Sequence, residues 1–169
     1  MSYFKYYLIN IRGNYEINDK MKKKLVLYLS GGLGNQLFQY FFGKSYAKNS
    51  DRELIIDNVS GFKTDFAFKR KYELPLIKNE KMKVRLFLFL FFRFLRKIFN
   101  VKHLRFFSNI FISEEKLFED KNFFDDNALV KNIYIIGNFQ NENYFKKSKF
   151  EILKNLDLNK VKNQDLIRK

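Results

Sequence analysis

The stretch Gly31-Gly32-Leu33-Gly34-Asn35-Gln36-Leu37-Phe38-Gln39-Tyr40 decides the fold of this chain. It follows an apolar run, Leu25-Val26-Leu27-Tyr28-Leu29, whose β-branched and aromatic residues predict a buried strand. After the glycines, apolar residues recur at three- and four-residue spacing, which predicts a helix that opens near Asn35 and ends at Asn49-Ser50. A strand, a glycine loop and a helix in this order are typical of an α/β fold.

The glycine loop has two interpretations. Gly31, Gly32 and Gly34 permit positive φ and leave the backbone open to a ligand. The start of the helix adds unpaired N–H groups and the positive end of its dipole, so a phosphate or another anion suits this place. A tight turn without a ligand explains the glycines equally well. Asn35 and Gln36 either cap the helix or offer amide groups to a phosphate or a sugar hydroxyl.

Two further strands are predicted, at Glu53–Asp57 and at residues 132–137. In a parallel sheet the carboxyl ends of the strands line the ligand crevice, which makes Asp57 a candidate site residue or else a helix cap. If the first and last of the three strands are parallel neighbours, Gln140 lies near the Asn35 loop. Tyr144, in a segment with helical spacing, is either a core residue or a pocket residue.

Composition excludes several classes of function. The chain of 169 residues has no cysteine and one histidine, His103, which argues against thiolate and histidine-rich metal centres, so we expect no metal. Its length is that of one domain. The loop is neither a dinucleotide fingerprint nor a P-loop, because these need glycine where Leu37 and Phe38 stand. The net charge of +15 could attract nucleic acid, but none of the usual nucleic-acid motifs is present, so we expect no nucleic-acid partner.

Much of that charge lies in residues 76–105, which hold nine basic residues and one acidic residue. Within them, residues 82–105 predict a basic amphipathic helix. Its uninterrupted apolar run, Leu86 to Phe92, is far shorter than the roughly 20 residues of a membrane span. We favour a helix buried in the fold with its charges outward, and an interfacial helix on an anionic membrane is the alternative. We therefore expect a cytoplasmic protein, with or without peripheral membrane contact.

We interpret residues 1–20 as an N-terminal extension and residues 21–169 as a single Rossmann-like domain, with Met21 as the natural start. Residues 1–20 alternate aromatic and polar residues without a clear period. Their apolar stretches are too short for a secretory signal. Met21-Lys22-Lys23-Lys24 runs directly into the first strand.

Three segments together resemble the α-1,2-fucosyltransferase family, inverting enzymes that move fucose from GDP-fucose to a galactoside hydroxyl. The stretch at residues 31–40 looks like the opening signature of the family. Arg70-Lys71-Tyr72-Glu73-Leu74 resembles the basic-aromatic-Leu segment after the second strand, and residues 137–145 resemble the Gly-Tyr-Phe-Gln-x-x-x-Tyr-Phe segment. The resemblance covers about residues 21–155.

The resemblance implies a Rossmann-like parallel sheet, the N-terminal, acceptor-side half of a two-Rossmann (GT-B-like) glycosyltransferase of surface glycan or lipopolysaccharide synthesis. It implies that Gly32, Gly34, Asn35 and Gln36 approach the donor diphosphate without a cofactor, while Asp57, Gln140 and Tyr144 line the acceptor side or the pocket.

The chain departs from the family in one respect. It has no His-x-Arg-Arg-x-Asp motif, which in the family lies in the donor-binding half, so no catalytic residue can be carried over. We therefore expect an incomplete enzyme. The rival from another class is a non-catalytic, basic, membrane-associated or interaction domain in which the glycine loop is only structural.

Overall fold

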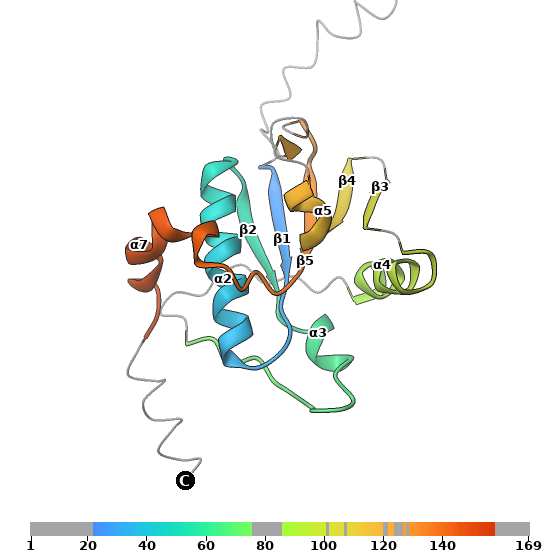
Figure 1. The fold of residues 1–169 in the computed structure, drawn as a ribbon, viewed down its shortest axis with the longest axis horizontal. Helices are drawn as coiled ribbons and strands as arrows, with labels where there is room; N and C mark the ends of the chain where they lie inside the picture. Colours follow the sequence, from blue (N-terminus) through green and yellow to red (C-terminus); the bar gives the residue numbers. More distant parts are fainter. Residues whose placement is uncertain are drawn as a thin grey trace, which may run out of the picture.

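The protein has an α/β fold built on one mixed sheet (Figure 1). The computed structural model describes residues 22–75, 86–100, 102–106, 108–119, 122–123, 127 and 129–157. Within them five strands lie in the order β2-β1-β5-β4-β3. Their bounds are β1 Lys24–Tyr28, β2 Glu53–Asp57, β3 His103–Phe106, β4 Asn109–Ser113 and β5 Asn132–Ile136. The pairs β1–β2, β1–β5 and β4–β5 are parallel, so the sheet is mostly parallel and compatible with a Rossmann-like architecture.

The three predicted strands are confirmed, and two more strands were missed. β3 and β4 pair antiparallel with each other, which corrects the expectation of a purely parallel sheet. β3 is an edge strand with His103 and Arg105 exposed, and such a polar edge carries little apolar signal. β4 is buried, but its five residues are too few for periodicity alone to separate a strand from a helix.

One face of the sheet carries most of the helical cover. α2 (Leu33–Asn49) packs along β1 and β2, with α5 (Glu114–Glu119) and α7 (Lys149–Leu153) beside it. The 3₁₀ turns η1 (Glu142–Tyr144) and η2 (Lys146–Ser148) lead into α7. The strand residues that face α2 form one hydrophobic cluster with it, and this cluster includes Leu25, Leu27, Ile56, Ile110, Ile133, Tyr40 and Phe42. A Cβ at Gly43 would stand 2.7 Å from Leu27 Cδ2, so a larger residue there would require the Leu27 side chain to shift.

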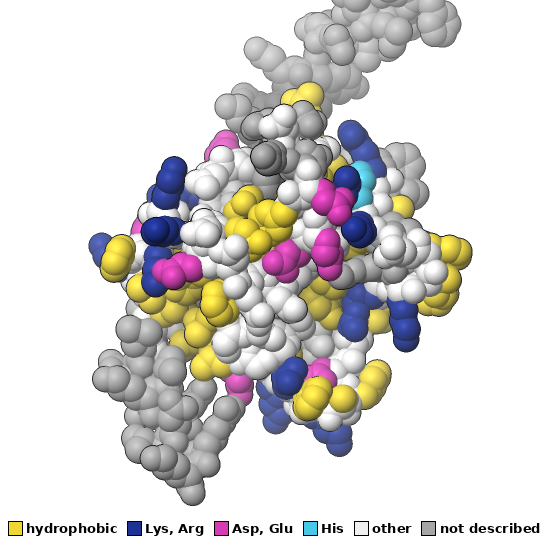
Figure 2. Space-filling model, viewed as in Figure 1, with side chains coloured by type: hydrophobic (Ala, Val, Ile, Leu, Met, Phe, Trp, Pro, Cys, Tyr) yellow, Lys and Arg dark blue, Asp and Glu magenta, His cyan; other side chains and the backbone are white. Residues whose placement is uncertain are grey.

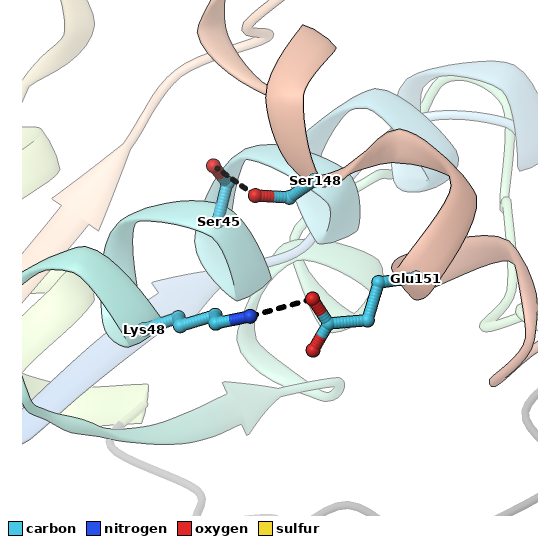
Figure 3. Close-up of polar contacts among 4 residues, drawn as sticks. All are labelled: Ser45, Lys48, Ser148 and Glu151. Atoms are coloured by element: carbon cyan, nitrogen blue, oxygen red, sulfur yellow. Dashed lines mark hydrogen bonds and ion pairs between the residues drawn. The ribbon is translucent and has the colours of Figure 1, made fainter.

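Polar contacts also fasten α7 to the carboxyl half of α2 (Figure 3). Lys48 Nζ donates to Glu151 Oε2 at 2.5 Å, and the hydroxyls of Ser45 and Ser148 share a hydrogen bond at 3.4 Å. Burial of Ile152 beneath these contacts joins α7 to the core. The helical spacing predicted for residues 143–156 is thus present as a short helix after two 3₁₀ turns.

The opposite face is covered by α4 (Leu86–Phe99), with α3 (Ser60–Lys63) at the carboxyl end of the sheet. The cluster on this face is smaller and consists of Val26, Tyr28, Ile55, Phe92, Phe111, Tyr134 and Ile136. The first residues of the predicted helix, 82–85, lie outside the described residues, as do 1–21 and 158–169. In the part of the chain that the structure describes, every helix is too short or too polar to cross a bilayer.

Among the described side chains of this helix, the prediction that it buries its apolar side and points its charges outward holds only in part. Phe92 is the one fully buried side chain among the described side chains of α4. Phe94 and Ile98 are 56% and 55% exposed, whereas the charged Arg93 is half-buried. Periodicity gave the helix correctly, but it could not say which side would meet the sheet.

Candidate functional site

A cleft of about 410 Å³ lies where the parallel strands end. Its walls come from the segments that follow β1, β2, β4 and β5, and from α4. The lining residues are Tyr28, Ser30, Gly31, Asn35, Gly61, Thr64, Asp65, Arg70, Arg93, Glu114, Glu115, Ile136, Gly137 and Asn138. The carboxyl edge of a parallel sheet is the usual place for a ligand in α/β proteins.

The glycine loop forms one wall of the cleft. Gly31 has φ +79°, and a Cβ there would stand 2.6 Å from Asn35 Nδ2, so the turn requires glycine. Gly32 is the N-cap of α2, and no side chain caps that end. A Cβ at Gly32 or Gly34 would meet nothing within 4 Å, so packing does not demand glycine at either position. Neither of these two glycines lines the cleft.

Asn35 does line the cleft, and Gln140 lies beside it as predicted. Gln140 Nε2 donates to Asn35 Oδ1 at 2.7 Å. β1 and β5 are parallel neighbours, which is the condition on which this prediction depended. Gln140 itself is exposed and does not line the cleft, so its contribution is to orient the Asn35 amide.

Gln36 does not face a ligand, which corrects the expectation from the sequence. Its side chain has no exposed surface. Nε2 donates to the carbonyls of Gly31 at 2.9 Å and Lys71 at 2.8 Å, and Oε1 accepts from the N–H of Glu73 at 2.9 Å. Both amide protons are therefore used within the protein. Gln36 joins the glycine loop to the segment at residues 71–73.

Gln39, which sequence reasoning missed, has a matching role one turn later. It is fully buried, and its Oε1 accepts from the N–H of Ser30 at 3.0 Å. Its Nε2 donates to the carbonyl of Gly137 at 3.0 Å. Gln39 thus ties together the loops after β1 and β5. The three-residue spacing of Gln36 and Gln39 on one helix side was the available signal.

Asp57, the second polar candidate, is also buried away from the cleft. It has no exposed surface and does not line the cleft. Its Oδ1 accepts from the N–H groups of Val59 and Ser60 at 3.0 and 2.8 Å, and its Oδ2 accepts from the Ser60 hydroxyl at 2.5 Å. These bonds hold the turn that leads into α3. Of the two roles predicted for Asp57, its contacts therefore match the capping role and not the pocket role.

Tyr144 is half-buried and packs against the hydrophobic core instead of lining the cleft. Its ring stacks on Phe118 with the centroids 4.1 Å apart and meets Phe42 edge to face. Burial, with the nearby Glu114 carboxylate, raises the pKa of the Tyr144 hydroxyl above its ordinary value. The core interpretation from the sequence thus holds for this residue.

Two arginines, Arg70 and Arg93, line the cleft, and the sequence analysis named neither of them as a site residue. Arg93 reaches in from α4, and its Nη1 donates to Tyr28 Oη at 2.6 Å and to Thr64 Oγ1 at 2.5 Å. Arg70 lies over the Phe68 ring, with its guanidinium carbon 4.2 Å from the centroid. Both cations stand in the same cleft as Asn35. Guanidinium groups suit phosphate and carboxylate ligands because of their planar set of donors.

The acidic residues of the cleft are partly engaged in holding its loops. Glu114 Oε2 accepts from the N–H groups of Asn138 and Phe139 at 2.8 and 2.9 Å. Asp65 accepts from the N–H groups of Phe68 and Arg70. These bonds direct part of each carboxylate toward the backbone instead of the cleft. Among the described residues, no group of three or more His, Cys, Asp and Glu side chains is placed to hold a metal ion.

Comparison with models of known protein families, with curated proteins and with solved structures finds no match. The site is therefore interpreted from its own geometry.

Proposed function

We propose that this chain is the acceptor-side domain of an inverting glycosyltransferase related to the α-1,2-fucosyltransferases. It takes part in the transfer of fucose from GDP-fucose to the 2-hydroxyl of a galactoside during synthesis of a surface glycan or lipopolysaccharide. In this proposal the sheet is one half of a two-Rossmann (GT-B-like) enzyme, and the cleft at the carboxyl ends of its strands faces the donor.

The observation that supports the proposal most is the presence of Asn35, Arg70 and Arg93 in one cleft beside the glycine loop. A sugar nucleotide presents a diphosphate and several hydroxyls. Arginines bind the charge, and an amide oriented by Gln140 binds hydroxyl or phosphate oxygens. Gly32 and Gly34 do not line the cleft themselves, but the space beside each of them is open at the start of α2.

The chemistry explains why a cation is needed there. In the inverting reaction the galactoside oxygen attacks C1 of fucose, and the bond from C1 to the diphosphate oxygen breaks. The electron pair passes to GDP, so negative charge grows on the leaving diphosphate, and the hydroxyl proton passes to a base. A guanidinium near that oxygen stabilises the developing charge. We assign this role to Arg93 and assign no residue of this chain to the base.

Titration calorimetry with GDP-fucose tests the proposal. We expect the wild-type chain to bind GDP-fucose and GDP, and Asn35→Ala to weaken both by about tenfold, because one oriented amide contributes about 1.4 kcal/mol to a charged ligand. Asn141→Ala is the matched control, since Asn141 is exposed and does not line the cleft. Absence of heat from the wild-type chain would refute donor binding by this domain.

A further inference from the structure

We propose that α4 and the segment after α3 form one docking surface for an anionic phospholipid bilayer. The docking surface consists of the exposed apolar side chains Phe66, Phe68, Leu90, Phe91, Phe94, Ile98 and Phe99 together with the cations around them. This inference stands on surface composition and not on the proposed reaction, so either can fail without the other.

The first half of the docking surface is the outer side of α4. Leu90, Phe94 and Ile98 recur every four residues and are 40%, 56% and 55% exposed. Such spacing aligns them in one stripe along the helix. Phe92, which is 1% exposed, packs against Phe111 of the sheet with ring centroids 5.5 Å apart. The helix therefore has an apolar side toward the sheet and a second one toward solvent.

The second half is the segment that follows α3. Phe66 and Phe68 are 84% and 69% exposed. Arg93 of α4 donates to Thr64 Oγ1, and α3 and α4 are in contact, so this segment adjoins the helix. Figure 2 shows apolar and basic side chains side by side at the right, over α4, and at the lower edge, over the segment after α3. Monomeric soluble proteins seldom expose aromatic residues in such number on neighbouring segments.

The charges near these side chains identify the partner as anionic. Residues 86–105 contain no acidic residue, and Lys97 of α4 is exposed. Around Phe66 and Phe68 lie Lys63, Lys69, Arg70 and Lys71, against Asp65 and Glu73. Aromatic side chains interleaved with lysine and arginine fit the boundary between acyl chains and anionic headgroups, where apolar burial and charge attraction act together. A protein partner with a purely apolar face would leave these cations without a counterpart.

Docking in this way would place the cleft at the membrane surface. Arg70 and Arg93 belong to the two segments of the docking surface and also line the cleft. A substrate carried by a lipid would then reach the cleft along the bilayer.

Vesicle flotation with the full chain tests the inference. We expect binding to vesicles of phosphatidylcholine mixed with phosphatidylglycerol and little binding to phosphatidylcholine alone. Phe94→Ser combined with Ile98→Ser should lower the partition coefficient by about tenfold, because two apolar side chains no longer enter the interface. Higher salt should weaken the binding of the wild-type chain.

Phe150→Ser is the matched control. Phe150 is 81% exposed but lies on α7, away from the docking surface. We expect this variant to float with the vesicles as the wild type does. Equal loss in both variants, or no loss in the double variant, would overturn the inference. Wild-type dimers in sedimentation velocity that the double variant abolishes would overturn it as well, since the stripe would then bind a second copy of the chain. Donor calorimetry on the double variant keeps this result separate from the proposed function.

Discussion

The two faces of the sheet differ in how their helices are held. α2 lies on the sheet with eight of its residues buried, including the polar Gln36, Gln39 and Ser45. α4, which is richer in phenylalanine and leucine, buries only Phe92 fully among its described side chains. Among the described side chains of the two helices, the helix with the weaker apolar pattern is thus the better buried one.

The difference shows that polar residues can be part of a helix interface when the backbone around them needs partners. Gln36 and Gln39 donate to backbone carbonyls and accept from backbone N–H groups, so their burial satisfies polar atoms of the glycine loop and of the segments beside it. The outer side of α4 meets no such loop and no apolar layer of the described fold. Its apolar residues therefore remain available for a partner.

The largest difference between the two faces should appear on truncating one phenylalanine on each. Phe42 is fully buried and stacks on Phe139, with the ring centroids 3.7 Å apart. We expect Phe42→Ala to lower the free energy of unfolding by about 3–5 kcal/mol. Phe94→Ala on the exposed stripe should change it by less than about 0.5 kcal/mol. Urea unfolding followed by circular dichroism measures both, and equal losses would remove the distinction between the faces.

The second test concerns the buried amide. Gln36→Leu keeps the volume but leaves the Gly31 and Lys71 carbonyls and the Glu73 N–H without their partner. We expect a loss of about 2–3 kcal/mol in the free energy of unfolding. Gln140→Ala, at an exposed position, should cost less than about 0.5 kcal/mol. A stable Gln36→Leu protein would mean that apolar burial alone holds α2.

The third test asks whether α4 contributes to the cleft. Arg93→Gln should weaken GDP-fucose binding by about tenfold, because a cation is lost from the cleft. Lys97→Gln is the matched control: it removes a cation four residues on that does not line the cleft, and it should leave the dissociation constant unchanged. Calorimetry on both variants gives the comparison. Equal affinities for wild type and Arg93→Gln would limit α4 to a surface role.

The smallest expected effect is one of pH on the α2 face. The Lys48 ammonium, as a hydrogen-bond donor, lowers the pKa of Glu151 below its ordinary value of 4.5, and Lys149 does the same for Glu142. A lowered carboxyl pKa in the folded state contributes stability above the ordinary value, and this is lost as the pH falls through the folded pKa. Thermal unfolding between about pH 6 and pH 3 should show a decline that is slightly smaller in Glu151→Gln. An identical decline in both proteins would show that the pair contributes nothing.

The sequence predicted much of the fold and a smaller part of the site. The strand, glycine loop and helix at residues 24–49 and the strands β2 and β5 were predictable, because their signals are local. The contact between Gln140 and Asn35 was predictable as well, once β1 and β5 were taken as parallel neighbours. Gln36 was wrongly placed at the ligand, and the sequence could not decide between a cap and a pocket role for Asp57 or between a core and a pocket role for Tyr144. Local sequence gives no sign of whether other parts of the fold or a ligand will be the partner of such a side chain.

The sequence by itself determined the α/β class, a glycine loop between the first strand and the first helix and a short amphipathic helix within residues 82–105. Only the tertiary structure decided that Arg93 lines the cleft and that the Gln36 side chain is fully buried. It also decided that the apolar stripe through Phe94 is exposed to solvent. The physical reason is that spacing along a helix fixes which side chains share a side. What covers that side depends on segments far away in the chain.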